Sequence, residues 1–298
     1  MTSRPGRPIV VGVDASPSSN DAVAWAARDA ELRGAPLRLV HVVPPIVMPA
    51  GPWRDATIPA SYAMYAERRA QQTVDDAYAV AMSATSPERA DQVATAVLDG
   101  PVVPTLIGLS RNAEMVVVGC LGESTLSRVL LGSISTGVVH HAHCPVAVIH
   151  NERRPSPDAP VVVGIDGSPA SEAATAIAFD ESSRRGVALV AVHAWTDMGP
   201  LDFPSINWSP IEWANIKVEE EEVLAERLAG WRDRYPDVTV RSVVVSDRPA
   251  PRLLEQADAA QLIVVGSHGR GGFEGMLLGS VSTAIVHSAE VPVIVARR

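Results

Sequence analysis

The chain has 298 residues, about twice the size of an ordinary domain of roughly 100–200 residues, so two domains are expected. Its 47% hydrophobic and 20% charged residues are typical of a globular protein with an aliphatic core and exclude a disordered or collagen-like chain. The formal net charge of −9 disfavours nucleic acid as a partner, because an acidic surface repels the phosphate backbone. No apolar run approaches the roughly 20 residues that cross a bilayer, and two cysteines form no disulfide framework, so we expect no membrane insertion and a cytoplasmic protein.

In the first half, short apolar runs alternate with longer helical patterns. Uninterrupted apolar runs predict strands covered on both faces. These strands are expected at 9–13, 37–43, 93–98, 115–119 and 145–149. The helices between them are expected at 16–34, which begins with Ser and ends with Gly, near 60–84, at 102–113 and after Gly132.

The second half repeats the first. The segment RPIVVGVDASPSS at 7–19 recurs as APVVVGIDGSPAS at 159–171, so that Asp14 corresponds to Asp166 at a spacing of 152 residues. A polar, proline-bearing segment separates the two copies. The sequence therefore predicts two homologous domains and a linker, at 1–150, 160–298 and 151–159.

The alternation of strands and helices predicts an α/β fold: two tandem, open, parallel five-stranded sheets, each doubly wound in the Rossmann-like manner. In such sheets ligands bind outside the carboxyl ends of the strands. Asp14 and Asp166 end the first strands, and Gly119 and Gly266 end the fourth strands. These residues are therefore expected at the ligand-binding edge.

Each fourth strand continues into a loop of the form G-x-x-G-(nine residues)-G-S. Its members are Gly119, Gly122, Gly132 and Ser133, then Gly266, Gly269, Gly279 and Ser280, at a spacing of 147 residues. Glycines let backbone N–H groups approach an anion, and the helix that follows offers its N-terminus to phosphate. Hydroxyl groups that either donate to the ligand or cap this helix are Ser133, Ser135, Ser280 and Ser282. A single loop of this kind serves equally well as a turn, but its recurrence predicts phosphate binding.

The loop is not a known catalytic phosphate motif. No Gly-Lys-Ser/Thr occurs, and no G-x-G-x-x-G follows the first strand; Lys217 is the only lysine. Without a lysine on the phosphates or an evident general base, the pattern indicates a nucleotide-binding protein with slow hydrolysis or none, rather than an enzyme.

The doubled loop and the domain plan resemble the universal stress protein family, in the tandem two-domain, ATP-binding form seen in actinobacteria. The resemblance covers nearly the whole chain. It implies the strand order 3-2-1-4-5, with adenine near the first-strand Asp and the end of the second strand. Ribose and phosphates would lie on the glycine loop, accompanied by Mg²⁺. It also implies a homodimer of the tandem chain and a stress-response regulator that acts as a nucleotide-dependent sensor or switch. By position, the implied contacts are Val13, Asp14, Val42, Gly119, Gly122, Gly132, Ser133, Ile134 and Ser135 in the first copy, and Ile165, Asp166, Ala194, Gly266, His268, Gly269, Gly279, Ser280, Val281 and Ser282 in the second.

The two loops differ in charge. After the second glycine the first copy has Glu123, which repels phosphate if it points inward, whereas the second copy has Arg270. We therefore expect both sites to bind, the first more weakly.

Two other functions fit parts of the pattern. The proline-rich segments 44–59 and 196–210 carry Trp53 and Trp208 and could serve a nucleotide-independent scaffold that binds a regulatory protein. An adenylyl transferase would need a further histidine near 267–271, which is missing.

Several other features are predicted to be structural. The cluster HHAHC at 140–144 is assigned to packing at a helix end rather than to a metal, because the second copy lacks it. Cys120 is interpreted as a small residue rather than a redox thiol. His41 and His193 are expected to be buried histidines with hydrogen-bond partners, and EEEE at 219–222 a solvated helix face.

Overall fold

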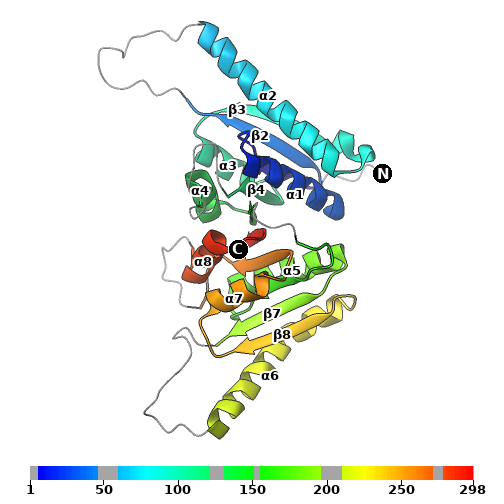
Figure 1. The fold of residues 1–298 in the computed structure, drawn as a ribbon, viewed down its shortest axis with the longest axis vertical. Coiled ribbons are helices and arrows are strands. Elements are labelled where there is room, and N and C mark those ends of the chain that lie inside the picture. Colours follow the sequence, from blue (N-terminus) through cyan, green and yellow to red (C-terminus); the bar gives the residue numbers. More distant parts are fainter. Residues whose placement is uncertain are drawn as a thin grey trace, which may run out of the picture. The chain divides into compact units, whose positions relative to one another are not determined.

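The computed structural model describes residues 6–45, 60–120, 131–150, 155–195, 210–270 and 278–297. Its contacts divide the chain into two compact units, Met1–Cys144 and Pro145–Arg298 (Figure 1). Each unit contains mainly parallel strands with helices packed against them. Within the described ranges no helix is long and apolar enough to cross a membrane.

The first unit alternates strands and helices. Its elements are β1 (Ile9–Gly12), α1 (Pro17–Arg33), β2 (Leu37–Val43), α2 (Ala60–Ala84), a short 3-10 helix (Pro87–Gln92), β3 (Val93–Asp99), α3 (Val102–Ser110), β4 (Met115–Gly119) and α4 (Ser133–His141). The strands are parallel in the order β3-β2-β1-β4, with Ile9 opposite Leu37 on one side and Met115 on the other. Because crossovers are right-handed and the order reverses between β1 and β4, α1 and α2 cover one face and α3 and α4 the other.

The second unit repeats this plan. Its elements are β6 (Val161–Gly164), α5 (Pro169–Arg185), β7 (Leu189–Ala194), α6 (Pro210–Arg234), β8 (Val240–Val245), α7 (Pro249–Ala257), β9 (Leu262–Gly266), α8 (Ser280–Ser288) and β10 (Val293–Ala296). The parallel order β8-β7-β6-β9-β10 is the predicted 3-2-1-4-5. The predicted doubly wound fold is therefore confirmed.

The strand β5 (Val146–Ile149) falls in the second unit. It pairs antiparallel with β10, with Val146 opposite Val295 and Val148 opposite Val293. All four of its residues are buried.

The first helix of each repeat begins and ends where the sequence predicts. Ser16 and Ser168 cap α1 and α5 by accepting hydrogen bonds from backbone N–H groups three residues later. Each helix then ends at a glycine in the left-handed region, Gly34 with φ 64° and Gly186 with φ 66°.

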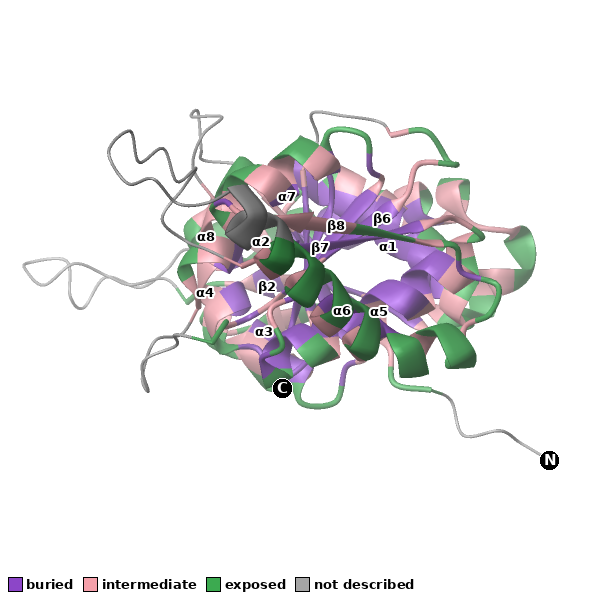
Figure 2. Cartoon of the chain, turned by 90° about the horizontal axis from the view of Figure 1, so that it is seen from below, coloured by how far each residue is buried: buried purple, intermediate pink, exposed green. Residues whose placement is uncertain are grey.

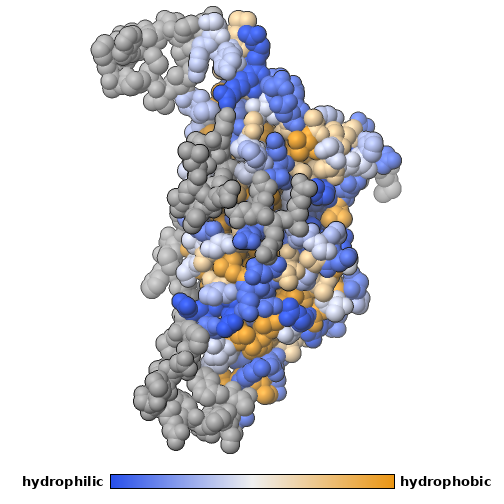
Figure 3. All heavy atoms as spheres, in the orientation of Figure 1, coloured by the Kyte–Doolittle hydropathy of each residue, from blue (hydrophilic) through white to orange (hydrophobic). Residues whose placement is uncertain are grey.

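The core consists of aliphatic side chains on the central strands, which Figure 2 shows as buried. The prediction that every strand is covered on both faces is wrong for β3, where four of seven residues are exposed, and for β8, which is only partly covered. Both are edge strands, with a neighbour on one side only. On the face shown in Figure 3, hydrophilic and hydrophobic residues are interspersed, as on most protein surfaces.

Candidate functional site

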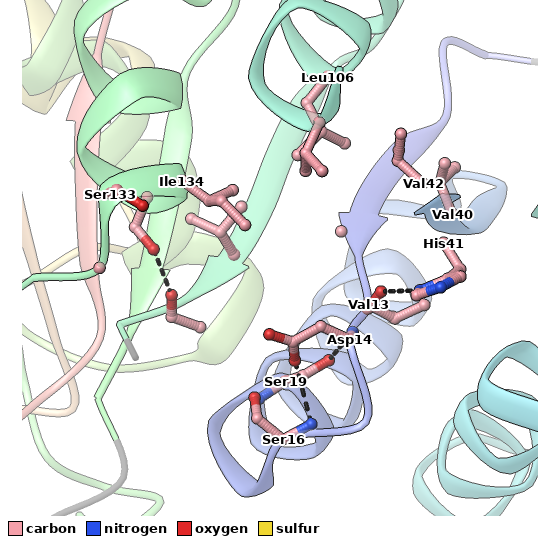
Figure 4. A pocket seen from close by; sticks show the side chains of 16 residues that line it. Val13, Asp14, Ser16, Ser19, Val40, His41, Val42, Leu106, Ser133 and Ile134 are labelled. Carbon is pink, nitrogen blue, oxygen red and sulfur yellow. Dashed lines mark hydrogen bonds between the residues drawn. The ribbon is translucent and has the colours of Figure 1, made fainter. Parts of the chain in front are cut away.

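The first repeat has a pocket at the carboxyl ends of β1 and β4, where the strand order reverses. Its cavity measures about 120 Å³. Side chains from β1, β2, α3 and α4 converge on it (Figure 4). The predicted residues that line it are Val13, Asp14, Val42, Gly119, Gly132, Ser133, Ile134 and Ser135. Gly122 and Glu123 lie outside the described residues.

The second repeat has the equivalent pocket between the ends of β6 and β9, with a cavity of about 330 Å³. All ten predicted residues of this copy line it: Ile165, Asp166, Ala194, Gly266, His268, Gly269, Gly279, Ser280, Val281 and Ser282. In each repeat the structure thus brings the strand-end residues and the described part of the glycine loop together around a pocket.

Part of each wall was not predicted. Val102 and Leu106 of α3, and Pro249 and Leu253 of α7, line the two pockets. Their apolar character is equally typical of a helix packed on a sheet, so they give no distinct signal. The alignment of the two copies places Leu106 and Leu253 at equivalent positions, and this recurrence could have identified them as candidate site residues.

The aspartate at the first strand end is held by its own loop. In the first repeat Asp14 Oδ1 accepts from the backbone N–H of Ser16 at 3.0 Å, and the Asp14 N–H donates to Ser19 Oγ at 3.2 Å. The same two bonds recur at Asp166, with Ser168 at 2.8 Å and Ser171 at 3.1 Å. Each carboxylate therefore has a fixed position at the pocket.

The next residue in each loop has a positive φ. Ala15 has φ 65°, in the region that favours glycine, and its counterpart Gly167 has φ 80°. A Cβ at Gly167 would also lie 2.5 Å from the guanidinium of Arg227 on α6, so that this side chain would have to shift. In the first repeat the residue equivalent to Arg227 is Ala77.

In the second repeat the glycine loop contacts the aspartate loop directly. The Arg270 N–H donates to Asp166 Oδ2 at 3.2 Å, and Ser168 Oγ donates to the His268 carbonyl at 3.2 Å. A Cβ at Gly269 would lie 2.6 Å from Asp166 Oδ2, so a side chain at this position would displace the carboxylate. The two loops thus close on each other.

The first glycine of each loop has a packing role. A Cβ at Gly119 would lie 2.7 Å from the backbone of Ser18, and one at Gly266 would lie 2.7 Å from the backbone of Ala170. Backbone atoms cannot shift as a flexible side chain can. These glycines therefore allow α1 and α5 to approach β4 and β9 closely.

The helices that follow the glycine loops each begin at a glycine. Gly132 and Gly279 are the N-cap residues of α4 and α8, and neither helix has a side-chain cap; α3 and α7 also lack one, whereas α1 and α5 have one. Ser135 and Ser282 donate to the carbonyls of the strand-end glycines and so fix each helix to its strand. The first N–H groups of α4 and α8 lie at the pocket, where they suit an anion.

The strand histidines differ between the repeats. His41 Nδ1 is 2.8 Å from the Val13 carbonyl, and His193 Nδ1 is 2.7 Å from the Ile165 carbonyl. His193 is completely buried, whereas His41 is partly exposed and lines its pocket. The prediction of a buried, satisfied histidine is confirmed for His193 and holds only in part for His41.

The described residues contain no group of three or more His, Cys, Asp or Glu side chains that could hold a metal ion. Cys144 is buried and Cys120 is partly buried.

Fold and pockets together define a tandem α/β protein with a pocket at the switch point of the strand order in each repeat. A sequence model of the universal stress protein family matches residues 6–150 and 159–297, so the chain belongs to that family, as predicted. It is 58% identical over 302 residues to Universal stress protein Rv1996 of Mycobacterium tuberculosis (strain ATCC 25618 / H37Rv), covering 97% of this chain and 94% of that protein. To Universal stress protein Rv2005c of the same strain it is 50% identical, with 97% of each chain covered. The crystal structure of a universal stress protein from Archaeoglobus fulgidus DSM 4304 has the same fold, with a TM-score of 0.68 at 22% identity over 98% of this chain and 99% of that one.

Proposed function

We propose that this protein binds an adenine nucleotide, ATP with Mg²⁺, in each of its two repeats and acts as a nucleotide-dependent regulator of the stress response. The observation that carries the proposal is the helix start in each pocket. There, an N-terminus without a side-chain cap faces a cavity that is lined by apolar side chains and by the strand-end aspartate. Such a site matches a ligand with an anionic end and a flat apolar end.

The chemistry of the walls fits the parts of a nucleotide. Val40, Leu106 and Val118 offer an apolar surface to a base, while Asp14 offers carboxylate oxygens to the amino or hydroxyl groups of adenosine. The phosphates would accept hydrogen bonds from the N-terminus of α4. Mg²⁺ would be held mainly by the phosphates and water, since it needs few protein ligands.

Ligand binding would rearrange the second site. Asp166 Oδ2 accepts from the Arg270 N–H, so a nucleotide hydroxyl that approaches this oxygen competes with the glycine loop. The arrangement of the glycine loop would then depend on whether nucleotide is bound. A binding protein without rapid hydrolysis can report the presence of its ligand in this way. We extend the proposal to a cytoplasmic homodimer of the tandem chain and a regulatory protein partner.

Titration calorimetry of the nucleotide-free protein with Mg-ATP tests this function. We expect two ATP per chain. Asp14→Asn and Asp166→Asn should each weaken one site by roughly tenfold or more, since loss of one hydrogen bond to a charged group is worth about 1.5–3 kcal/mol. Asparagine keeps the Oδ1 that accepts from the loop N–H and replaces the other carboxylate oxygen by an NH₂ group, which cannot accept.

Asp180→Asn is the matched control. Asp180 is paired with Arg184 on the surface of α5, away from the residues that line the pocket, and its replacement should leave both sites unchanged. A folded protein that gives no heat with Mg-ATP would overturn the proposal and favour the nucleotide-independent scaffold. Light scattering across a concentration series tests the homodimer.

A further inference from the structure

The two pockets have different walls at a few equivalent positions. Most lining residues match, including both strand-end aspartates, the glycines and the helix-start serines. Among the positions described in both repeats, those that differ, first repeat before second, are Val13 and Ile165, Val42 and Ala194, Val102 and Pro249, and Ile134 and Val281. His268 and Arg270 also line the second pocket, and their counterparts lie outside the described residues.

The largest of these differences lies at the end of the second strand. Val42 lies beside Val40 on the pocket side of β2, because side chains two residues apart in a strand share a face (Figure 4). Val42 is only 5% exposed, so its two methyl groups fill the wall. Ala194 has no such groups and is partly exposed to the cavity.

The other differences do not cancel this one. Val281 has one methylene group fewer than Ile134, and Ile165 has one more than Val13, which leaves the second pocket roomier at Ala194. On the wall formed by α3 and α7, Leu106 in the first repeat and Leu253 in the second are the same residue type, whereas Val102 and Pro249 differ. A smaller side chain at Leu106 therefore does not make up for Val42 in the first pocket.

Resting on the proposed function, which puts the base against the apolar wall that includes Val40 of β2, we propose that the neighbouring Val42, and Ala194 at the equivalent position of the second repeat, give the two sites different base selectivity. The first site takes unsubstituted adenine nucleotides. The second also takes adenine nucleotides that carry an added substituent on the base. A group the size of a methyl meets buried Val42 in the first site, and a packed wall rejects such an addition because its neighbours cannot move aside without strain.

The experiment titrates the full chain with Mg-ATP and with ATP analogues that carry a methyl, methylthio or bromo group at N6, C2 or C8. Together these analogues probe each open edge of adenine. We expect two ATP per chain and, for at least one analogue, one per chain. Val42→Ala should raise the binding stoichiometry of that analogue to two per chain. Ala194→Val should raise the ratio of its Kd to that of ATP at the second site by about tenfold or more, the usual effect of a misplaced methyl group in an apolar pocket.

Val97→Ala is the control, because it makes the same change on β3 at a side chain that is 38% exposed and does not line the pocket. The selectivity is overturned if ATP binds twice per chain while every analogue binds both sites equally, binds neither, or is unaffected by the two exchanges. Absence of ATP binding overturns the proposed function as well, so the two failures are distinguishable.

Discussion

His193 and Glu220 are joined across the second repeat, with His193 Nε2 2.9 Å from Glu220 Oε2 while Nδ1 faces the Ile165 carbonyl. Both ring nitrogens therefore face oxygen acceptors. In the first repeat Ala70 stands where the second has Glu220, and the pair has no counterpart.

This pair should stabilise the second repeat. Glu220→Ala leaves the completely buried His193 without its Nε2 partner, and we expect it to lower the free energy of unfolding by about 1–3 kcal/mol. Urea denaturation followed by circular dichroism measures the loss. Glu221→Ala is the control, because Glu221 is exposed and lies 3.7 Å from Lys217, a surface pair worth under about 1 kcal/mol. Equal losses in the two variants would refute the role of the pair.

His150 should make stability depend on pH. Burial, and then the nearby charge of His287, lower the pKa of His150 from 6.5 to about 4, and its Nε2 has no hydrogen-bond partner among the described residues. The folded protein thus favours neutral His150, so this contribution is complete above pH 6.5 and is lost as the pH falls through 4. Between pH 7 and 4 the wild type should lose about 3 kcal/mol more than His150→Phe. Parallel stability profiles for the two proteins would contradict the assignment.

The first glycine of the loop should be needed for folding. Gly266→Ala places a Cβ against the Ala170 backbone, and we expect a loss of about 1–3 kcal/mol in the free energy of unfolding. Gly230→Ala, inside α6 with open space around it, should instead add about 0.5–1 kcal/mol. In thermal unfolding, Gly266→Ala should lower the Tm and Gly230→Ala should raise it. If both are stabilised, the close approach of α5 to β9 is not required.

Gly167 and Arg227 should be coupled. Gly167→Ala combines a positive φ with a collision against the guanidinium, and we expect it to cost about 1–2 kcal/mol. In an Arg227→Ala background, which reproduces the Ala15 and Ala77 of the first repeat, the same change should cost less. A double-mutant cycle measures the difference, and additive effects would show that the two residues act independently.

Much of the fold could be predicted from the sequence, because uninterrupted apolar runs identify strands between sheet-covering helices. The limits of β2 and α2, 37–43 and 60–84, agree with the prediction. The exposure of β3 was missed because an apolar run does not show which strand lies at the edge, although the implied order 3-2-1-4-5 places the third strand there. The run at 219–222 was expected to be a solvated face, which is correct for its exposed members but wrong for Glu220, whose partner lies 27 residues away.

The candidate site was predictable where it repeats. The duplicated loop and the two aspartates identified it, while the wall from α3 and α7 and the packing role of Gly119 did not follow from residue type. Residue type alone does not distinguish a glycine that a ligand requires from a glycine that a neighbouring helix requires. For Gly119 the short distance between its Cβ position and the backbone of Ser18 shows the packing role.

The antiparallel pairing of β5 with β10 has a consequence for the separated halves. A fragment that begins at 159 would lack β5, and β10, whose four residues are all completely buried in the full chain, would have a bare edge. Such an edge is a template for a strand from another molecule. By supplying β5 on the same polypeptide, the tandem chain presents the covering strand at a high effective concentration, independent of how much protein the cell contains.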